Sequence, residues 1–90
     1  MLSQAKIRFI NQLSRKKIRQ DQGCFIVEGN KGVREGIGEG LTVRELYVTD
    51  QSSIPLFDAE VISEKEMKMI SQLTTPSDTL AVFNFPKIKD

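Results

Sequence analysis

The sequence predicts an α/β sandwich, in which a small, mostly parallel sheet of about four strands has helices on both faces. Short apolar segments typical of strands alternate along the chain with amphipathic segments typical of helices. The 90 residues suffice for one domain with a single hydrophobic core. No apolar run approaches the roughly 18 residues that a membrane-spanning helix needs, so no membrane partner is expected.

The N-terminal region predicts a helix followed by a basic segment. Ser3 is a suitable N-cap, because its hydroxyl can accept a hydrogen bond from the first helical turn. The buried face of this helix is expected to carry Ile7, Ile10 and Leu13. Residues 14–22 are polar, and the helix either continues into them or frays there. Gly23 is expected to turn the chain into the first strand.

The first strand and the second helix follow directly. The unbroken apolar run 24–27 predicts a strand that is covered on both faces. The helix is expected from about Asn30 to Glu39, with Gly40 ending it. Its buried stripe is expected to carry Val33, Ile37 and Leu41. Three glycines in or near this helix each cost roughly 1 kcal/mol against alanine: Gly32, Gly36 and Gly38. Close packing against the sheet and a ligand near the helix N-terminus are both open as explanations.

The remainder of the chain predicts two further strands, a helix and a last strand. In order, we expect a strand at 43–48, a loop at 50–55, a short strand at 59–62, a helix, a strand at 79–83, and a tail or linker at 86–90. Ser63 and Glu66 have the S-x-x-E spacing of a capping box, which opens this third helix. Its inward face is expected to carry Met67, Ile70 and Leu73. Pro76 and the two threonines before it are expected to end it.

The composition excludes several kinds of catalytic site. The chain has no histidine, so it has no imidazole base and no Ser–His or Cys–His pair. Its single cysteine, Cys24, is interpreted as a buried small apolar group, and no metal site is expected. No carboxylate or lysine has a recognisable catalytic spacing, and no phosphate-binding glycine motif is present. The residues alone therefore indicate a binding or scaffolding module, with no catalytic and no cofactor-binding residue.

The net charge of +1 hides a separation of charge along the chain. Residues 1–34 carry eight basic and two acidic residues, a net charge of +6. Residues 35–90 carry five basic and ten acidic residues, a net charge of −5. Such a separation favours a face that binds a polyanion. The alternative is a solvated helix end whose charges keep the domain soluble.

Several short motifs occur in a fixed order along the chain. They are Lys16-Lys17-x-Arg19, Gly23-x-Phe25-x-Val27-Glu28-Gly29, Glu35, Leu46-Tyr47-Val48-Thr49, Val61-Ile62-Ser63, and Thr75-Pro76 followed by Leu80-Ala81-Val82. In this order and spacing they resemble the N-terminal substrate-binding domain of the SpoU/TrmH family of RNA ribose 2′-O-methyltransferases. The resemblance extends over nearly the whole chain, from about Ser3 to Phe83.

This resemblance implies the three-layer α/β/α sandwich of the ribosomal proteins that bind kinked RNA. It implies that residues 1–85 form an RNA substrate-binding domain and that residues 86–90 begin a linker to a catalytic methyltransferase domain. That domain, missing from this chain, would bind S-adenosylmethionine and form a homodimer. The chain alone is therefore expected to be non-catalytic and to hold ribosomal or transfer RNA in the cytoplasm for the full-length enzyme.

Under the resemblance, RNA is expected to contact both ends of the stretch 15–34. The basic run would supply phosphate contacts, which position RNA with little sequence information. The expected RNA-binding residues are Arg15, Lys16, Lys17, Arg19, Glu28, Gly29, Asn30, Lys31 and Arg34. Gly29 would permit an unusual backbone angle or a close approach of RNA. Glu28 has an alternative role, as a structural cap on the amides of the turn that follows it.

The start of the second helix differs from a related RNA-binding signature. Kink-turn-binding proteins of this fold carry Asn-Glu-x-x-Lys there, whereas this chain has Asn30-Lys31-Gly32-Val33-Arg34. Lys31 thus replaces an acceptor carboxylate with a cation that only donates. We therefore expect binding led by RNA shape and phosphates, and the sparse aromatic residues give no evident stacking platform for bases.

Two other functions remain open from the sequence. The chain could be a stand-alone RNA-binding protein of ribosomal type, which would bind kinked RNA without a second domain. It could also be a protein-interaction module in which the separation of charge is incidental.

Overall fold

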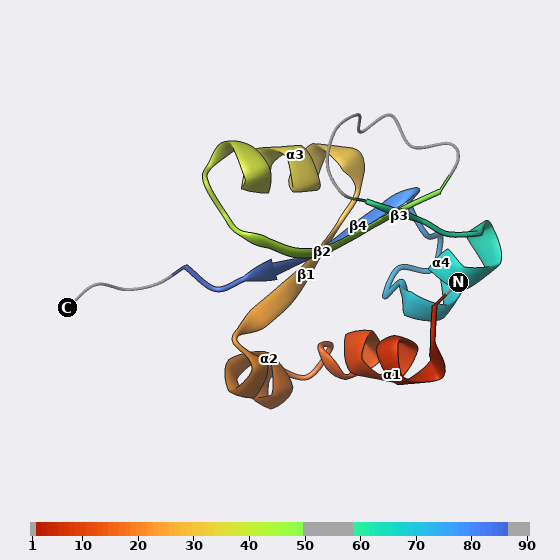
Figure 1. Ribbon diagram of the computed structural model, residues 1–90, viewed down its shortest axis with the longest axis horizontal. Helices are drawn as coiled ribbons and strands as arrows, with labels where there is room; N and C mark the ends of the chain where they lie inside the picture. The colour runs from red at the N-terminus through yellow and green to blue at the C-terminus, as the bar shows by residue number, and fades with distance from the viewer. Residues whose placement is uncertain (1, 50–58, 87–90) are drawn as a thin grey trace.

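The computed structural model describes residues 2–49 and 59–86, which form three layers. In chain order the elements are α1 (Gln4–Gln12), α2 (Lys16–Gln22), β1 (Cys24–Glu28), α3 (Asn30–Gly38), β2 (Val43–Val48), β3 (Glu60–Val61), α4 (Glu64–Ile70) and β4 (Thr79–Asn84). Figure 1 shows α3 on one face of the sheet and α1, α2 and α4 on the other. The three-layer α/β/α sandwich is thus confirmed. The loop expected at 50–55, and all of the tail except Pro86, lie outside the described residues.

The sheet is mixed, so the prediction of a mostly parallel sheet is wrong. Its strand order is β1-β4-β2-β3. The last strand, β4, lies between β1 and β2 and runs antiparallel to both, while β2 and β3 are parallel. The β-α-β alternation correctly indicates that β1 and β2 share a direction. It carries no information on the direction of β4.

The direction of β4 is set by the end of the sheet at which its first residue arrives. Hydrogen bonds join the beginning of β4 to the points where β1 and β2 finish. The Gly29 N–H donates to the Thr79 carbonyl at 2.9 Å, and the Thr49 N–H donates to the Asp78 carbonyl at 3.0 Å. Because β4 begins where its two neighbours end, it has to run in the opposite direction.

Alternation along β4 divides the interior into two cores. Leu80 and Val82 pack toward α1 and α4, while Ala81 and Phe83 pack toward α3. These four side chains are fully buried. A strand covered on both faces reads as a continuous apolar run, which explains why residues 79–83 could be recognised from the sequence.

The basic run forms a helix of its own, which was neither of the two outcomes expected for residues 14–22. Helix α1 is capped at Ser3, as predicted, by a bond from the Lys6 N–H to the serine hydroxyl at 3.1 Å. The helix ends at Gln12, and α2 starts at Lys16 after a short turn. Gly23 ends α2 with a left-handed φ of 69°, so the predicted turn is confirmed.

Close packing explains two of the glycines in α3. A Cβ at Gly36 would lie 2.8 Å from the Phe83 ring, and one at Gly32 would lie 3.0 Å from the Val27 side chain. Gly38 has open space around it. Gly40 ends the helix as predicted, with a φ of 88°. Its N–H donates to Ile37, and the Leu41 N–H donates to Gly36, which is the Schellman pattern.

Helix α4 has the predicted capping box but is shorter than predicted. The Ser63 hydroxyl accepts from the Glu66 N–H at 3.0 Å, and the Glu66 carboxylate accepts from the Ser63 N–H at 3.1 Å. The helix ends at Ile70, and Ser71 already has an extended backbone. Leu73 is 50% exposed, so its predicted place on the inward face is wrong. The third strand is also shorter than predicted, since β3 contains only Glu60 and Val61.

Two glycines of α3 have different surroundings, so substitution by alanine is predicted to have opposite effects at the two positions. Gly36→Ala should lower the free energy of unfolding by about 1–3 kcal/mol, because the added methyl group overlaps Phe83. Gly38→Ala, the matched control, should raise it by up to about 1 kcal/mol through helix propensity. Urea unfolding of both variants checks this. Equal stabilisation by both would contradict the packing explanation.

Glu66 predicts an acid-sensitive part of the stability. Hydrogen bonds from the Leu2 N–H and the Ser63 N–H hold the pKa of this carboxyl below its ordinary 4.5. A lowered folded-state pKa means that the stabilisation is complete above pH 4.5 and is lost as pH falls through the folded-state pKa. In urea unfolding over a pH series, the stability difference between wild type and Glu66→Gln should therefore shrink in acid. The control Glu64→Gln, on the same helix turn, should show no such change; a pH-independent difference for Glu66→Gln would refute the linkage.

Candidate nucleic-acid interface

The residues predicted to bind RNA do not form one continuous surface. They fall into two groups at opposite ends of β1. Arg15 to Arg19 lie at and in α2, which precedes β1, whereas Glu28 to Arg34 lie at the turn from β1 into α3. Helices α2 and α3 also cover opposite faces of the sheet, as Figure 1 shows. A stretch that is continuous in sequence is therefore divided in space.

The group at α2 contains three exposed cations and one structural cation. Arg15, Lys16 and Lys17 are exposed. The Arg19 guanidinium instead donates to the carbonyls of Leu13 and Ser14, both at 2.9 Å. These are carbonyls at the C-terminal end of α1, where a cation also complements the helix dipole. Arg19 therefore fixes α2 against α1, and its three neighbours present their charges to solvent.

Arg44, which the sequence analysis did not single out, attaches the other end of α2 to the sheet. Its guanidinium donates to the Gln22 carbonyl at 3.0 Å, to Asn84 Oδ1 at 2.6 Å and to Cys24 Sγ at 3.3 Å. Cys24 is fully buried, as predicted. Burial raises the pKa of its thiol above the ordinary value, which the Arg44 charge partly offsets. The thiol is therefore a packed interior group, and α2 is held at both ends.

The group at the β1–α3 turn ties two parts of the backbone together. The Glu28 carboxylate accepts from the Ser71 hydroxyl at 2.6 Å and from the Gln72 N–H at 2.8 Å. Asn30 Oδ1 accepts from the Thr79 hydroxyl at 2.6 Å. Gly29 has a φ of 97°, so the unusual backbone angle expected there is confirmed. Glu28 thus has a structural role, but a different one from the predicted cap: within the described residues its carboxylate binds the segment after α4 and not the amides of its own turn.

The same turn presents positive charge at the start of α3. Lys31 and Arg34 are exposed on the first turns of this helix. The helix has no acidic residue in its first turn, and no side chain caps its N-terminus. Backbone N–H groups and two cations at a helix start favour an anion. This end of the domain can therefore accept a phosphate, on the face opposite α2.

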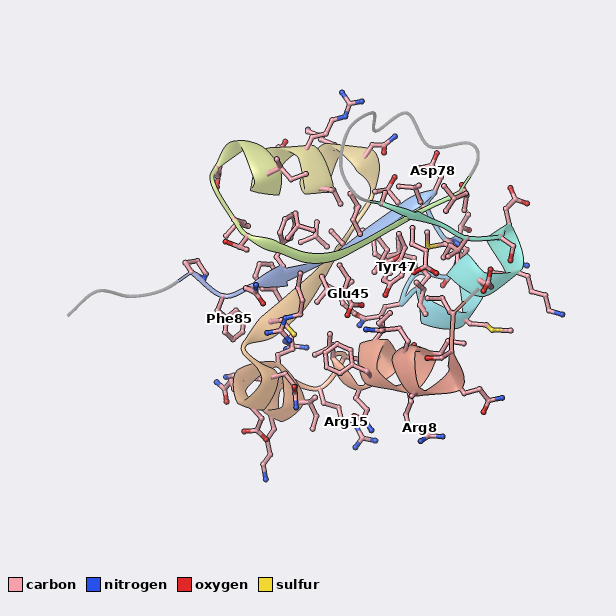
Figure 2. All side chains as sticks on the ribbon, in the orientation of Figure 1. Arg8, Arg15, Glu45, Tyr47, Asp78 and Phe85 are labelled. Atoms are coloured by element: carbon pink, nitrogen blue, oxygen red, sulfur yellow. The ribbon has the colours of Figure 1, made fainter. Side chains whose placement is uncertain are left out.

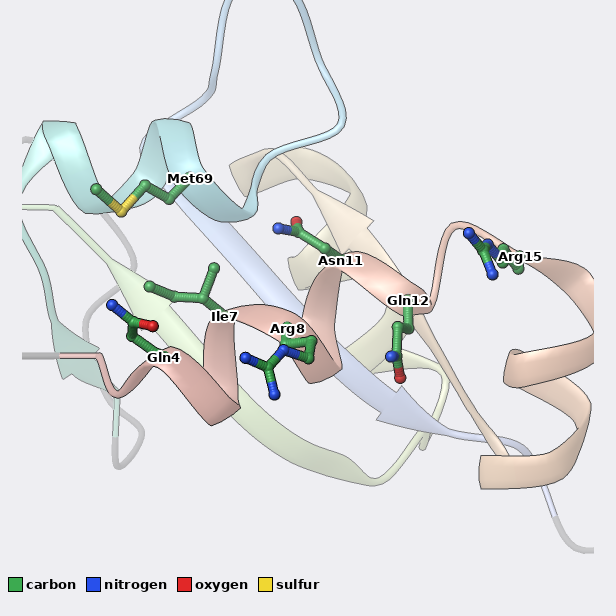
Figure 3. A pocket seen from close by; sticks show the side chains of 7 residues that line it. All are labelled: Gln4, Ile7, Arg8, Asn11, Gln12, Arg15 and Met69. Atoms are coloured by element: carbon green, nitrogen blue, oxygen red, sulfur yellow. The ribbon is translucent and has the colours of Figure 1, made fainter.

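A groove along α1 contains residues that the sequence analysis missed. Its volume is about 540 Å³, and it is lined by Gln4, Ile7, Arg8, Asn11, Gln12, Arg15 and Met69. Figure 3 shows Met69 reaching from α4 toward Ile7, with the polar side chains following α1. Only Arg15 belongs to the predicted set. The missed signal is the polar face of α1, where positions 4, 8 and 11 recur at helical spacing beside the apolar face.

A charged cluster beneath α1 fixes the orientation of this groove. Lys6 Nζ lies 2.5 Å from Glu45 Oε2, and the Tyr47 hydroxyl donates to Glu45 Oε1 at 2.5 Å. Burial, and next the bond to Glu45, raise the pKa of Tyr47 well above its ordinary value. Figure 2 shows Glu45 and Tyr47 between the sheet and α1, and Arg8 and Arg15 pointing away from the sheet. The contacts with β2 therefore leave the polar face of α1 open to solvent.

The described residues contain neither a metal-binding cluster nor a membrane-spanning helix. Within residues 2–49 and 59–86, no group of three or more His, Cys, Asp or Glu side chains is arranged to hold a metal ion. Over these ranges, no helix has the length and apolarity to cross a membrane.

Comparison with known proteins identifies the family. Residues 4–81 match the family described as the MRM3-like substrate binding domain. The chain therefore belongs to this family and is an N-terminal substrate-binding domain of the SpoU/TrmH type. The resemblance found in the sequence motifs is thus confirmed. No curated protein sequence matches the chain.

Solved structures agree with this assignment. A protein assigned as an RNA methyltransferase of the TrmH family, from Porphyromonas gingivalis, is 34% identical with a TM-score of 0.82, and the match covers 100% of this chain and 38% of that one. An RNA 2′-O-ribose methyltransferase is 20% identical with a TM-score of 0.81, covering 97% and 37%. AviRb from Streptomyces viridochromogenes, solved with AdoMet, is 17% identical with a TM-score of 0.75, covering 94% and 37%. The last two show the fold alone.

The geometry of Glu28 predicts that it acts on stability first. Glu28→Ala should lower the free energy of unfolding by about 1–3 kcal/mol, because it leaves the Ser71 hydroxyl and the Gln72 N–H without their charged acceptor. Glu35→Ala, which removes an exposed carboxylate from α3, should change it by no more than about 0.5 kcal/mol. Urea unfolding measures both. Unchanged stability together with weaker RNA binding would assign Glu28 to RNA contact instead.

Proposed function

We propose that this chain holds RNA for a ribose 2′-O-methyltransferase that modifies ribosomal or transfer RNA. The observation that carries the proposal is the match of residues 4–81 to a substrate-binding domain. The 34% identity to an assigned TrmH-family methyltransferase supports the same reaction class. The chemistry of the surface agrees with an RNA substrate, because exposed cations of α2 and the start of α3 both suit phosphates.

The methyl transfer itself is assigned to a separate catalytic domain. The chain spans 33–38% of the length of the solved methyltransferases that it matches. The groove along α1 does not suit S-adenosylmethionine, because its charged groups are two guanidinium cations and no carboxylate lines it to balance the sulfonium cation. We therefore assign the cofactor to the catalytic domain of a full-length enzyme, with this chain positioning the RNA. We also propose that the homodimer contact lies in that domain and that the enzyme is cytoplasmic.

RNA binding is proposed to be led by phosphates and shape at the two cationic groups. Arg15, Lys16 and Lys17 offer three point contacts on a helix that is fixed at both ends. Lys31 and Arg34 offer contacts on the other face, beside the α3 backbone amides. Phosphate contacts are independent of base identity, so this part of the interface fixes the position of RNA rather than its sequence.

The contribution of α2 can be measured with a charge-matched pair of variants. Lys16→Gln/Lys17→Gln should weaken binding to RNA stem-loops of unrelated sequence by a similar factor and make the plot of log affinity against log salt shallower by about 1.5. Arg19 is left intact because it caps α1. The control Lys65→Gln/Lys68→Gln removes two exposed cations from α4 and should change the slope little.

Two outcomes would contradict the proposed function in different ways. A wild-type chain with no measurable affinity for RNA at low salt would favour a protein-interaction module. Equal effects of the α2 and α4 variants would show that α2 is only a solvated surface, and RNA contact would then have to lie elsewhere.

A further inference from the structure

We propose that the groove along α1 is a subsite for unpaired nucleotides, in which amide side chains contact base edges and two arginines contact the flanking phosphates. The proposal rests on the proposed RNA-binding function and adds a part of the interface that responds to base identity. It also adds residues outside the basic run, since Gln4, Arg8, Asn11 and Gln12 belong to α1.

The charge of the groove favours a polyanion. Its two ionic side chains, Arg8 and Arg15, are both cationic and exposed, and no acidic residue lines it. Across residues 2–49 and 59–86, neither guanidinium makes an ion pair or a side-chain hydrogen bond. Their donors are therefore directed to solvent and available to a ligand, in contrast to those of Arg19 and Arg44.

The groove continues directly into the cations of α2. Arg15 lines the groove and is also the N-cap residue of α2, with Lys16 and Lys17 following it. Helices α1 and α2 cover the same face of the sheet (Figure 1). An RNA strand whose bases occupy the groove can therefore pass its next phosphates to α2 without crossing to another face of the domain.

The uncharged lining suits bases better than it suits an acidic peptide. Gln4, Asn11 and Gln12 each carry a carbonyl acceptor and an amino donor, so they can pair with the edge of a base. An acidic peptide would need further cations in their place. Ile7 and Met69 form the apolar part of the groove lining, and the Met69 side chain is 44% exposed to solvent (Figure 3). A polarisable thioether makes favourable contacts with flat aromatic rings, and a base is such a ring.

The dimensions suit a short unpaired segment. From Gln4 to Asn11 the groove follows α1 for roughly 10 Å, which is the length of about three stacked nucleotides. In an RNA duplex the base edges that carry most sequence information are buried in a deep, narrow groove, whereas a single strand can turn its bases toward a protein. No aromatic side chain lines the groove, and the aliphatic and thioether groups of Ile7 and Met69 take the place of an aromatic stacking platform.

The test compares single variants on single-stranded and duplex probes. Probes are short oligomers of uridine, adenosine or cytidine and an RNA duplex of the same length, with binding followed by fluorescence anisotropy over a salt series. Arg8→Gln should weaken oligomer binding roughly fivefold at low salt and lower the salt slope by about 0.7. Lys65→Gln, on α4 and outside the groove, removes the same charge and should do neither.

Two further variants separate base contacts from electrostatics. Asn11→Ala should reduce the preference among the three oligomers while leaving the affinity for the duplex unchanged. Met69→Ala should weaken oligomer binding a few-fold without changing the salt slope, since no charge is removed. All substituted side chains are exposed, so thermal unfolding should be unchanged and loss of folding is not expected to interfere.

The outcomes distinguish this proposal from the function on which it rests. If the chain binds RNA but Arg8→Gln, Asn11→Ala and Met69→Ala all match the Lys65→Gln control, the groove is overturned as a subsite and the proposed function stands. If the wild-type chain binds neither oligomers nor duplex at low salt, the proposed function fails and the groove fails with it. Smaller preference among oligomers for Asn11→Ala, at constant duplex affinity, supports the subsite directly.

Discussion

The structure depends on one constraint, which is that the last strand of the chain occupies the centre of the sheet. β4 separates β1 from β2, so without residues 79–84 the strand β1 has no partner and β2 has only the two-residue strand β3. The side chains of β4 also belong to both hydrophobic cores. Leu80 and Val82 pack on one face of the sheet, and Ala81 and Phe83 pack on the other. The helices on both faces therefore pack against a strand that follows all of them in the chain, and neither core is complete without residues 79–84.

The Glu28 carboxylate stabilises this arrangement at the end of the sheet. By accepting from Ser71 and Gln72, it holds the segment that follows α4 at the place where β1 finishes. The Thr79 hydroxyl then reaches Asn30, which joins the first residue of β4 to the first residue of α3. The family motif includes Glu28 and Gly29 at this turn, and both residues have a structural role there. Their presence in the motif therefore does not by itself indicate RNA contact.

The features that could be predicted from the sequence are those decided within a few residues. The Ser3 cap, the Ser63–Glu66 capping box and the glycine at the end of α3 each depend on neighbours along the chain, and each was confirmed. Other features depend on residues that are far apart along the chain. Glu28 lies 43 and 44 positions from its two partners, and Arg44 lies 22 positions from the Gln22 carbonyl. The direction of β4 likewise depends on bonds from its first residues to the distant ends of β1 and β2. A local sequence pattern carries no information on such contacts. The mixed sheet, the shorter α4 and the structural role of Arg44 could therefore be found only from the structure.

The same distinction decides what the charge separation means for RNA. The sequence places +6 in residues 1–34, which suggests one basic face. In the fold, β1 carries the chain from one end of the sheet to the other, so the cations are divided between the α1–α2 face and the start of α3. Arg19 is moreover used within the protein, whereas Arg8, outside the basic run, points to solvent beside Arg15. The α1–α2 face therefore combines adjacent exposed cations with side-chain amides and the apolar side chains of Ile7 and Met69. The α3 face has cations and backbone amides. Under the proposed function, the protein can respond to base identity only where its side chains contact the edges and rings of bases. Of the two surfaces of the domain, the one formed by α1 provides such side chains.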